Sequence, residues 1–535
     1  MNRTSTLPRL DAEGLIVDGQ PTFVVGGEVH NSSTRTPEAT AIAFRRAREI
    51  GADTVLAPVS WELLEPSRGV FDFSQIDGML KAAGQEDVRL IPLWFGSWKN
   101  ATSSYAPGWV KRDTYQFPRA HIRTGPIEHL SPFSGSARDA DASAFAHLMA
   151  HIREWDHDGR VVMVQIENEV GVLGDSRDRS HVAERAWAQT VPQAVLDAMA
   201  SAPHIPAAQS WLAAGRPSIG TWAEIFGGSI EGDEAFMAWA FSTYIEAVAS
   251  AGAAEHRVPY FVNAWLNTEV DIESPAAQPI ALAGGAEPGG YPSGGPVARV
   301  APIWAVGAPT IDFLAPDIYF GDFAATCAAF SEVSGVLFIP EMRRSELGIA
   351  QMIVAIGEFR AFGVSPFGVD SLEPGSPDES ALADGYRQAR ALANLLVGEP
   401  GCRSQAVIVD HAAPKSVMEF GELTLTVTPS SRSETDASSP GYVAVVEEQQ
   451  GRFVVIGRGV SITPSFRDGR RAGILSVDEF DFDGGWKPRG RLNGDETASG
   501  TAVRIPPRLP SSPDRFPIPL VTTSTGILRA EFYEF

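Results

Sequence analysis

The residues best suited to chemistry in this sequence are two glutamates, Glu169 and Glu341, that each follow an apolar run. The run Val161–Ile166 stops at the polar sequence ENE (167–169), and GVLFIPEM (335–342) places Glu341 after a similar run. Such runs are typical of buried parallel strands, and the catalytic groups of a (β/α)8 barrel lie where its strands end. Two carboxyls that meet at one face of a barrel are the apparatus of glycoside hydrolysis.

The two glutamates would divide the work between them. Glu341 would attack the anomeric carbon as the nucleophile, while Glu169 would protonate the leaving oxygen and later deprotonate the incoming water. Because the acid must keep its proton near neutrality, we expect burial and the charge of Glu341 to raise the pKa of Glu169. We expect Asn168 to donate a hydrogen bond to the sugar hydroxyl next to the anomeric carbon.

A structural interpretation of the same residues is the alternative. In that interpretation Glu167 and Glu169 cap a following helix, and Glu341 pairs with Arg343 or Arg344 at the surface. The occurrence of Asn-Glu after one strand together with Glu after another favours the catalytic interpretation.

The elements that must position these residues alternate between short apolar runs and helical patterns, which indicates βαβ units and a parallel sheet. Eight runs in this order predict a (β/α)8 TIM barrel with long loops. A doubly wound open sheet is the alternative, but no GxGxxG or P-loop follows any of the runs. The predicted strands are Phe23–Gly27, Thr54–Val59, Leu90–Phe95, Val161–Ile166, Tyr260–Asn263, Asp312–Ala315, Val336–Ile339 and Gly363–Phe367, and helices are predicted at Glu38–Ile50, Ser143–Trp155, Glu234–Ala249 and Gln351–Phe362.

Polar or aromatic residues follow the predicted strands, as expected for a ring of groups around one pocket. The Gly- and Pro-rich segment 283–300 is expected to cover or border that pocket, and residues 170–192 and 207–230 to shape its entrance. The residues predicted to contact substrate are Glu28, His30, Glu62, Trp98, Asn168, Asn263, Trp265 and Tyr319.

These candidates also have structural alternatives. His30 would then be a core histidine bonded to Glu62 or to a backbone carbonyl. Glu62 would instead pair with Lys99 or Arg112. The aromatic candidates would be core residues, and Asn263 would cap backbone groups.

From about residue 400 the pattern changes to short, alternating, β-branched segments separated by turn clusters, which predicts an all-β sandwich or open barrel. We therefore divide the chain into a catalytic barrel (1–400) and a C-terminal β-sandwich-like domain (401–535). The domain either binds polysaccharide itself or packs as a support for the barrel or a dimer.

Composition narrows the functional classes. The formal net charge of −23 disfavours nucleic-acid binding. The absence of HExxH, CxxC and EF-hand patterns favours chemistry without a metal or cofactor. No apolar leader and no run of about 18 apolar residues is seen, so we expect no membrane span and a cytoplasmic location, or a periplasmic one if a leader has been trimmed. The expected partner is a carbohydrate substrate, with a homo-oligomer left open.

A resemblance adds to this interpretation. Asn-Glu after the fourth strand with Glu after the seventh is the pattern of the large glycosidase clan A. Within that clan the chain resembles the bacterial β-galactosidases of glycoside hydrolase family 35, closest to the subgroup with an added C-terminal β domain, in which RLNGDE (491–496) is similar to a recurring segment. The segments that carry the barrel resemblance are GGEVHNSS, TVLAPVSWELLEP, FDFSQIDGML, LWFGSWKN, SSYAPGWVKRD and IENEVGVLGDSRDRS.

The resemblance implies a retaining mechanism on terminal β-galactosyl residues, with Glu169 as acid/base and Glu341 as nucleophile. It also implies a hydrogen bond from Tyr319 to the nucleophile. Two departures concern the sugar contacts: the first strand reads GGEVHNSS rather than nearer SGSIHY, and the third lacks Cys-Ala-Glu. The rival hypotheses are therefore a β-glycosidase of another sugar, an endo-glycanase, and a carbohydrate-binding barrel without activity.

Overall fold

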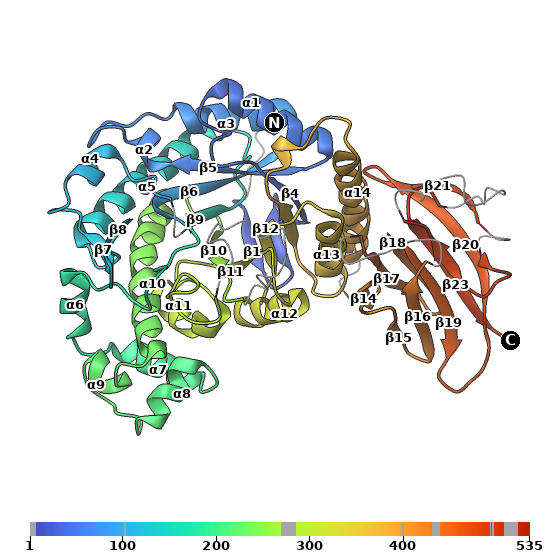
Figure 1. Cartoon of the computed structure of the whole chain (residues 1–535). Coiled ribbons are helices and arrows are strands. Elements are labelled where there is room, and N and C mark those ends of the chain that lie inside the picture. Colours follow the sequence, from blue (N-terminus) through green and yellow to red (C-terminus); the bar gives the residue numbers. More distant parts are fainter. Residues whose placement is uncertain are drawn as a thin grey trace. The chain divides into compact units, whose positions relative to one another are not determined.

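The computed structural model places eight parallel strands in a closed barrel (Figure 1). It describes residues 7–100, 103–268, 285–398, 401–430, 439–492, 494, 497–507 and 523–535. Around the barrel the strands follow chain order, which confirms the predicted TIM-barrel fold. They are β4 (Val24–Glu28), β5 (Thr54–Ser60), β6 (Arg89–Lys99), β9 (Val164–Asn168), β10 (Tyr260–Trp265), β11 (Phe313–Ile318), β12 (Phe338–Met342) and β13 (Gly363–Pro366).

Seven of the eight barrel strands differ in length from their predictions, and β6 and β9 are two examples. Strand β6 continues four residues past Phe95, to Lys99, because the backbone stays extended through the polar end of WFGSWK. Strand β9 begins only at Val164, although Val161 still forms an isolated bridge to Leu90.

Helices alternate with the strands as predicted, with some changed ends. Helix α13 (Glu346–Gly357) is capped by Ser345 and ends before the predicted Phe362. Its last residue, Gly357, packs against Ala406 and Ala444 with no room for a side chain. The other helices are α1 (Pro37–Ile50), α2 (Trp61–Leu64), α3 (Ser74–Glu86), α4 (Gly108–Arg112), α5 (Gly135–Trp155), α6 (His181–Trp187), α7 (Gln193–Ser201), α8 (Pro206–Ala213), α9 (Trp222–Phe226), α10 (Ile230–Glu255), α11 (Ala301–Gly307), α12 (Phe323–Ser334) and α14 (Pro377–Gly398), with short 3-10 turns η1 (Ala298–Val300) and η2 (Val369–Ser371).

Small strands lie outside the barrel wall. β1 (Arg9–Asp11), β2 (Gly14–Val17) and β3 (Gln20–Thr22) form a three-stranded sheet, and β7 (Arg119–Ile122) pairs with β8 (Gly125–Leu130). No helix in the described part of the chain combines the length and apolar character that a membrane crossing requires.

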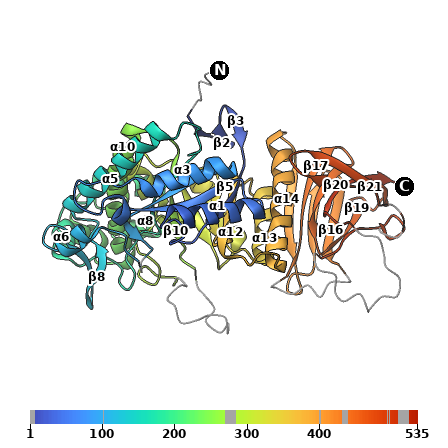
Figure 2. The ribbon, with the colours of Figure 1, turned by 90° about the horizontal axis from the view of Figure 1, so that it is seen from above.

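The C-terminal segment is all β, as predicted, and forms two sheets around one apolar core (Figure 2). Val443, Phe453 and Val455 of the larger sheet and Met418 and Leu425 of the smaller one belong to that core. The larger sheet has the order β14 (Ser404–Val409), β17 (Gly441–Gln449), β18 (Arg452–Arg458), β23 (Ile527–Glu534), β20 (Ala472–Phe482) and β21 (Trp486–Arg491), and the smaller has β15 (Ser416–Phe420), β16 (Leu423–Pro429), β19 (Val460–Phe466) and β22 (Val503–Ile505).

The chain forms two compact units whose division differs from the change in secondary structure near residue 400. One unit consists of Pro21–Gly27, Ala47–Ala52 and Met342–Phe535 and so joins the last barrel elements to the sandwich; the other contains the rest. In the RLNGDE segment, Asn493, Asp495 and Glu496 lie outside the described residues.

Candidate active site

Glu169 and Glu341 are held at the same ends of barrel strands. Glu169 directly follows β9, and Glu341 lies in β12, where it is 7% exposed and accepts a hydrogen bond from the Tyr319 hydroxyl at 3.0 Å. This contact is the one that the resemblance implied for Tyr319. Burial first, and then the charge of Glu341, raise the pKa of Glu169 to about 7, as a general acid requires.

The structural alternatives for the two glutamates are wrong. The next helix after Glu169, α6, begins only at His181, so Glu169 caps no helix. Its own backbone N–H instead donates to the Asn263 side chain at 3.0 Å. Glu341 is buried against Tyr319 rather than exposed at the surface.

The backbone around the candidate acid is unusual. Glu167 and Glu169 both have positive φ, +58° and +48°, a conformation that costs a non-glycine residue free energy and clusters at functional sites. The Glu167 side chain is buried, and its carboxylate accepts hydrogen bonds from the backbone N–H groups of Ser97 (3.0 Å) and Trp98 (2.7 Å). These bonds tie the end of β9 to the end of β6.

A buried polar network supports Glu167. Asp141 of α5 accepts from Ser97 and from the Trp94 indole, and it contacts the Tyr244 hydroxyl. Burial and the charge of Asp141 raise the pKa of Glu167 well above its ordinary value. Gly96 is required here, because a Cβ on it would lie 2.6 Å from the Glu167 carboxylate and 2.7 Å from that of Asp141.

Two charged residues that sequence analysis did not assign to the site face the glutamates. Burial lowers the pKa of Lys99, but the charges of Glu341, Glu169, Glu28 and Asp317 outweigh it and raise that pKa above its usual range. Burial and the same carboxylates raise the pKa of Asp317 well above its ordinary value. The sequence signal was present for both, since each stands at the end of an apolar strand.

Asn168 has the surroundings expected of a substrate contact. Its side chain is buried, and neither its amide nitrogen nor its carbonyl oxygen has a hydrogen-bond partner within the described ranges. Its backbone carbonyl accepts from Asn100, which holds the residue in place. Buried polar groups normally find a partner, so the unsatisfied side chain supports the predicted bond to a sugar hydroxyl.

The structure brings Asn263 and Glu28 to the same charged cluster. Asn263 contacts Glu169 through its carbonyl oxygen, while its amide donates to Asp317 at 2.7 Å. Glu28 is buried at the end of β4, and its charge acts on Lys99 and Asp317. Asn263 thus bonds a backbone group, as its structural alternative expects, and its contact with the sugar stays a prediction.

The remaining candidates lie at strand ends with differing surroundings. His30 is partly exposed just after β4, and Trp265 is buried at the end of β10. Glu62 is 3.9 Å from the Lys111 ammonium, an ion pair that neither sequence interpretation named. Trp98 is 2% exposed and packs edge-on against Phe241 and Tyr244 of α10, the arrangement of a core residue.

The described part of the 283–300 segment, from residue 285, packs on the chain that leaves Glu169. Val172 and Ser293 exchange backbone hydrogen bonds at 3.1 and 2.8 Å. Gly171, with φ of +143°, lies so close to Pro292 that an added Cβ would be 2.4 Å from that ring. The two loops therefore form one wall beside the acid/base candidate.

No group of three or more His, Cys, Asp or Glu residues among the described ranges is arranged to hold a metal ion. The groups gathered at the mouth include carboxyls, amides, an ammonium and a phenol. They can exchange protons, bind hydroxyls and present a nucleophile.

The fold and this site together define a (β/α)8 barrel with paired carboxyls at its strand ends. Residues 14–214, which contain the first four barrel strands and Glu169, match the family model described as glycosyl hydrolases family 35. The match confirms the resemblance found in the sequence and relates the barrel to glycoside hydrolases. A second model, described as a domain of unknown function (DUF5597), matches residues 382–504.

The chain is also similar to curated proteins that are named as β-galactosidases. The β-galactosidase of Xanthomonas manihotis is 28% identical over 176 residues, which are 31% of this chain and 26% of the relative. Beta-galactosidase 8 of Oryza sativa subsp. japonica is 27% identical over 31% of this chain and 24% of its own length. The matched segment thus spans about a quarter of either relative.

Solved structures with a similar arrangement include the β-galactosidase of Rahnella sp. R3, with 14% identity, a TM-score of 0.47, and coverage of 71% of this chain and 57% of that one. The catalytic domain of a β-amylase from Paenibacillus polymyxa has 13% identity, a TM-score of 0.45 and coverage of 68% and 97%.

Proposed function

We propose that the protein is a retaining exo-glycosidase that removes terminal β-D-galactosyl residues from oligo- or polysaccharides. One observation carries the proposal: a glutamate with a pKa near 7, Glu169, interacts electrostatically with a buried glutamate, Glu341, that is hydrogen-bonded to Tyr319. Double displacement needs a buried acid that keeps its proton near neutrality beside a second carboxyl that can attack the sugar.

In the first step Glu341 attacks the anomeric carbon, and the bond to the leaving oxygen breaks as Glu169 transfers its proton to that oxygen. Tyr319 orients the attacking carboxylate through its hydroxyl. Asn168, whose side chain has no hydrogen-bond partner among the described residues, binds the neighbouring sugar hydroxyl, and such a bond strengthens as positive charge develops on the ring.

In the second step Glu169, now ionised, takes a proton from water, whose oxygen attacks the anomeric carbon and releases Glu341. Net configuration is retained because the carbon is inverted twice. The wall made by residues 170–176 and 285–297 beside Glu169 supports a closed pocket, and hence exo action. The names of the curated relatives support galactose as the sugar.

The test is p-nitrophenol release from a panel of aryl β-glycosides by the wild type and by Glu341→Gln. We expect fast cleavage of the galactoside and a loss of at least about 10³-fold in the variant. Cleavage of another sugar would keep the mechanism but reject the galactose specificity. Cleavage of long polysaccharide alone would favour an endo-glycanase, and sugar binding without any cleavage would favour a binding protein.

Polysaccharide binding by the C-terminal sandwich is a second candidate function, favoured by a cleft of about 910 Å³ at one end of its sheets. This volume is in the range of ligand sites. Rings of Phe466 and Tyr533 line the cleft, and Arg470 lies 5.0 Å from the Phe466 ring. Fixed aromatic faces beside ion-paired polar groups suit a neutral sugar chain, which has apolar ring faces and many hydroxyls.

Affinity electrophoresis in gels that contain galactan or arabinogalactan tests this candidate. We expect Tyr533→Ala to abolish the retardation while aryl galactoside hydrolysis stays unchanged. Tyr115→Ala, which removes a 98% exposed tyrosine elsewhere, is the matched control. Equal retardation of Tyr533→Ala and wild type would reject the cleft as the binding site.

A further inference from the structure

The mouth of the barrel holds more carboxyls than a two-glutamate mechanism uses. Glu28, Asp317 and Glu341 lie in three different strands, Glu169 directly follows a fourth, and all four face the Lys99 ammonium. If all four carboxyls were ionised, their negative charge would exceed what Lys99 offsets. Such a state is costly in a low-dielectric site, so protons stay on part of the cluster at neutral pH.

Asp317 is connected to Glu169 by two routes. The first is the Asn263 side chain, which accepts from the Glu169 backbone at 3.0 Å and donates to the Asp317 carboxyl at 2.7 Å. The second is direct, since the Asp317 and Glu169 carboxyls hydrogen-bond each other. A hydrogen bond between two carboxyls requires a proton on one of them.

We propose, as an extension that rests on the proposed function, that Asp317 is a positioning residue for the acid/base Glu169. Asp317, fixed by Asn263, keeps a proton of its own throughout the reaction and donates it in a hydrogen bond to the Glu169 carboxyl. The proton of Glu169 then remains available for the leaving oxygen. Burial and the neighbouring carboxylates raise the pKa of Asp317, which is consistent with this role.

The benefit appears when Glu169 becomes an anion. After its proton moves to the leaving oxygen, the new carboxylate lies beside a donor, the Asp317 hydroxyl, rather than beside a second negative charge. When water attacks, its proton returns to Glu169, and Asp317 has neither gained nor lost one. Preorganised donors at a developing charge are a major source of rate acceleration.

The charged and titratable groups that face the pair come from every side of the mouth. They are Glu341 of β12, Tyr319 just after β11, Glu28 of β4 and Lys99 of β6. Lys99 offsets one charge of the cluster, and its charge lowers the pKa of Glu169. The protonation of Asp317 and Glu169 therefore depends on the charges of all these residues.

The test compares Asp317→Asn, whose amide can still donate a hydrogen bond, with Asp317→Ala, which cannot. Each is measured on an aryl galactoside with a good leaving group and on an alkyl galactoside with a poor one, from pH 4 to 9. We expect Asp317→Asn to stay within about threefold of the wild type and Asp317→Ala to lose about 100-fold on the poor leaving group but less than about tenfold on the good one. If alanine unfolds the chain, Asp317→Leu, similar in size and unable to donate, takes its place.

Three results would overturn the proposal. Equal losses in the Asn and Ala variants would show that an ionised carboxylate is needed. Equal losses by Asp317→Ala on both leaving groups would show a merely structural role. Full activity of every variant would show no role. The proposed function fails separately, if the wild type cleaves no β-glycoside or if Glu341→Gln retains activity.

Discussion

Two buried carboxyls, Glu479 in the sandwich and Asp317 in the barrel, have opposite surroundings. The Glu479 carboxylate accepts five hydrogen bonds from the hydroxyls and backbone of Thr523, Ser524 and Thr525, at 2.6–3.2 Å. Burial alone would raise its pKa, but these donors lower it below the ordinary value. Asp317 has one N–H donor, the Asn263 amide at 2.7 Å, its carboxyl faces those of Glu169 and Glu341, and its pKa is raised.

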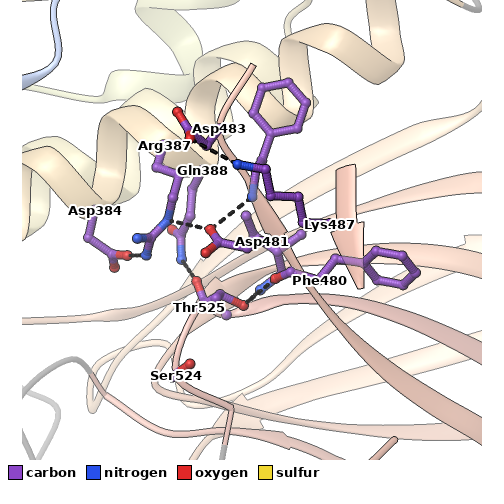
Figure 3. Close-up of polar contacts among 12 residues, drawn as sticks. Asp384, Arg387, Gln388, Phe480, Asp481, Asp483, Lys487, Ser524 and Thr525 are labelled. Carbon is purple, nitrogen blue, oxygen red and sulfur yellow. Dashed lines mark hydrogen bonds and ion pairs between the residues drawn. The ribbon is translucent and has the colours of Figure 1, made fainter. Parts of the chain in front are cut away.

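Further hydrogen bonds connect the chain around Glu479 to helix α14. Figure 3 shows Thr525 between Gln388 of α14 and Phe480. The Thr525 carbonyl accepts from the Gln388 amide at 3.0 Å, and the Thr525 hydroxyl donates to the Phe480 carbonyl at 2.7 Å. Arg387 donates a hydrogen bond to Asp384. Such a network fixes the position of a sheet. The difference teaches that burial alone does not mark function. In the catalytic region the buried acids have fewer donors than Glu479 has, and their charges repel each other.

The largest loss of activity is expected when the acid Glu169 itself is removed. Glu169→Ala should lower kcat/KM by about 10²–10⁴-fold on an alkyl galactoside, because its leaving oxygen needs a proton. A dinitrophenyl galactoside, whose leaving group needs none, should lose far less in its first step. Burst kinetics on both substrates check this, and equal losses in that step would contradict the assignment.

A smaller effect is expected when the one ammonium in the cluster is removed. Lys99→Met should lower kcat/KM about tenfold, since its charge stabilises the ionised carboxylates of the mouth. It should also move the basic limb of the pH profile upward, because Lys99 holds the pKa of Glu169 down. Lys81→Met, at an exposed position in α3, is the matched control and should change neither quantity. A downward shift of the limb would contradict this sign.

Replacing the buried carboxylate of the sandwich, Glu479, should change the stability of the protein and not its activity. Glu479→Gln should destabilise the protein by about 2 kcal/mol at pH 7, since buried donors lose a charged acceptor, with kcat unchanged. Because the folded pKa is depressed, this stabilisation is present above the ordinary pKa of 4.5 and is lost as pH falls below it. Urea denaturation at pH 7 and pH 3.5 measures the difference, with the exposed Glu419→Gln as control.

The smallest effect is a gain in stability, opposite in sign to the loss expected for Glu479→Gln. The pKa of Glu169 rises from 4.5 to about 7 on folding, so its ionisation costs stability as pH rises through that range. Glu169→Gln should therefore be more stable than the wild type by about 1 kcal/mol at pH 8 and equal to it near pH 4. Calorimetry of the wild type and the variant at the two pH values checks this prediction. A variant that is less stable than the wild type at pH 8 would contradict it.

The sequence predicted the eight strands because β-branched runs mark them well, and it found Glu169 and Glu341 because both follow such runs. It could not show that Lys99 and Asp317 join them, because which charges meet depends on strand length and on neighbours around the barrel. Asp141 was missed for a local reason: the segment GSARDADA resembles a loop, yet it is the first part of α5, begun by the Ser134 cap.

Trp98 illustrates the reverse case. An aromatic residue at a strand end suggested a sugar contact, but α10 places Phe241 and Tyr244 against its ring. The β-sheet pattern alone cannot tell which strand ends a later helix will cover. Tertiary packing decides between a binding surface and a core residue.

The compact unit that contains Pro21–Gly27 together with Met342–Phe535 has a consequence for biosynthesis. The partners of β4 in that unit, such as Tyr386, whose hydroxyl donates to Gly26, emerge from the ribosome more than three hundred residues later. At typical rates of translation this delay is on the order of tens of seconds. Strand β4 must wait through it with an unpaired edge, so nascent chains of this protein should need chaperone protection until the C-terminal segment has been made.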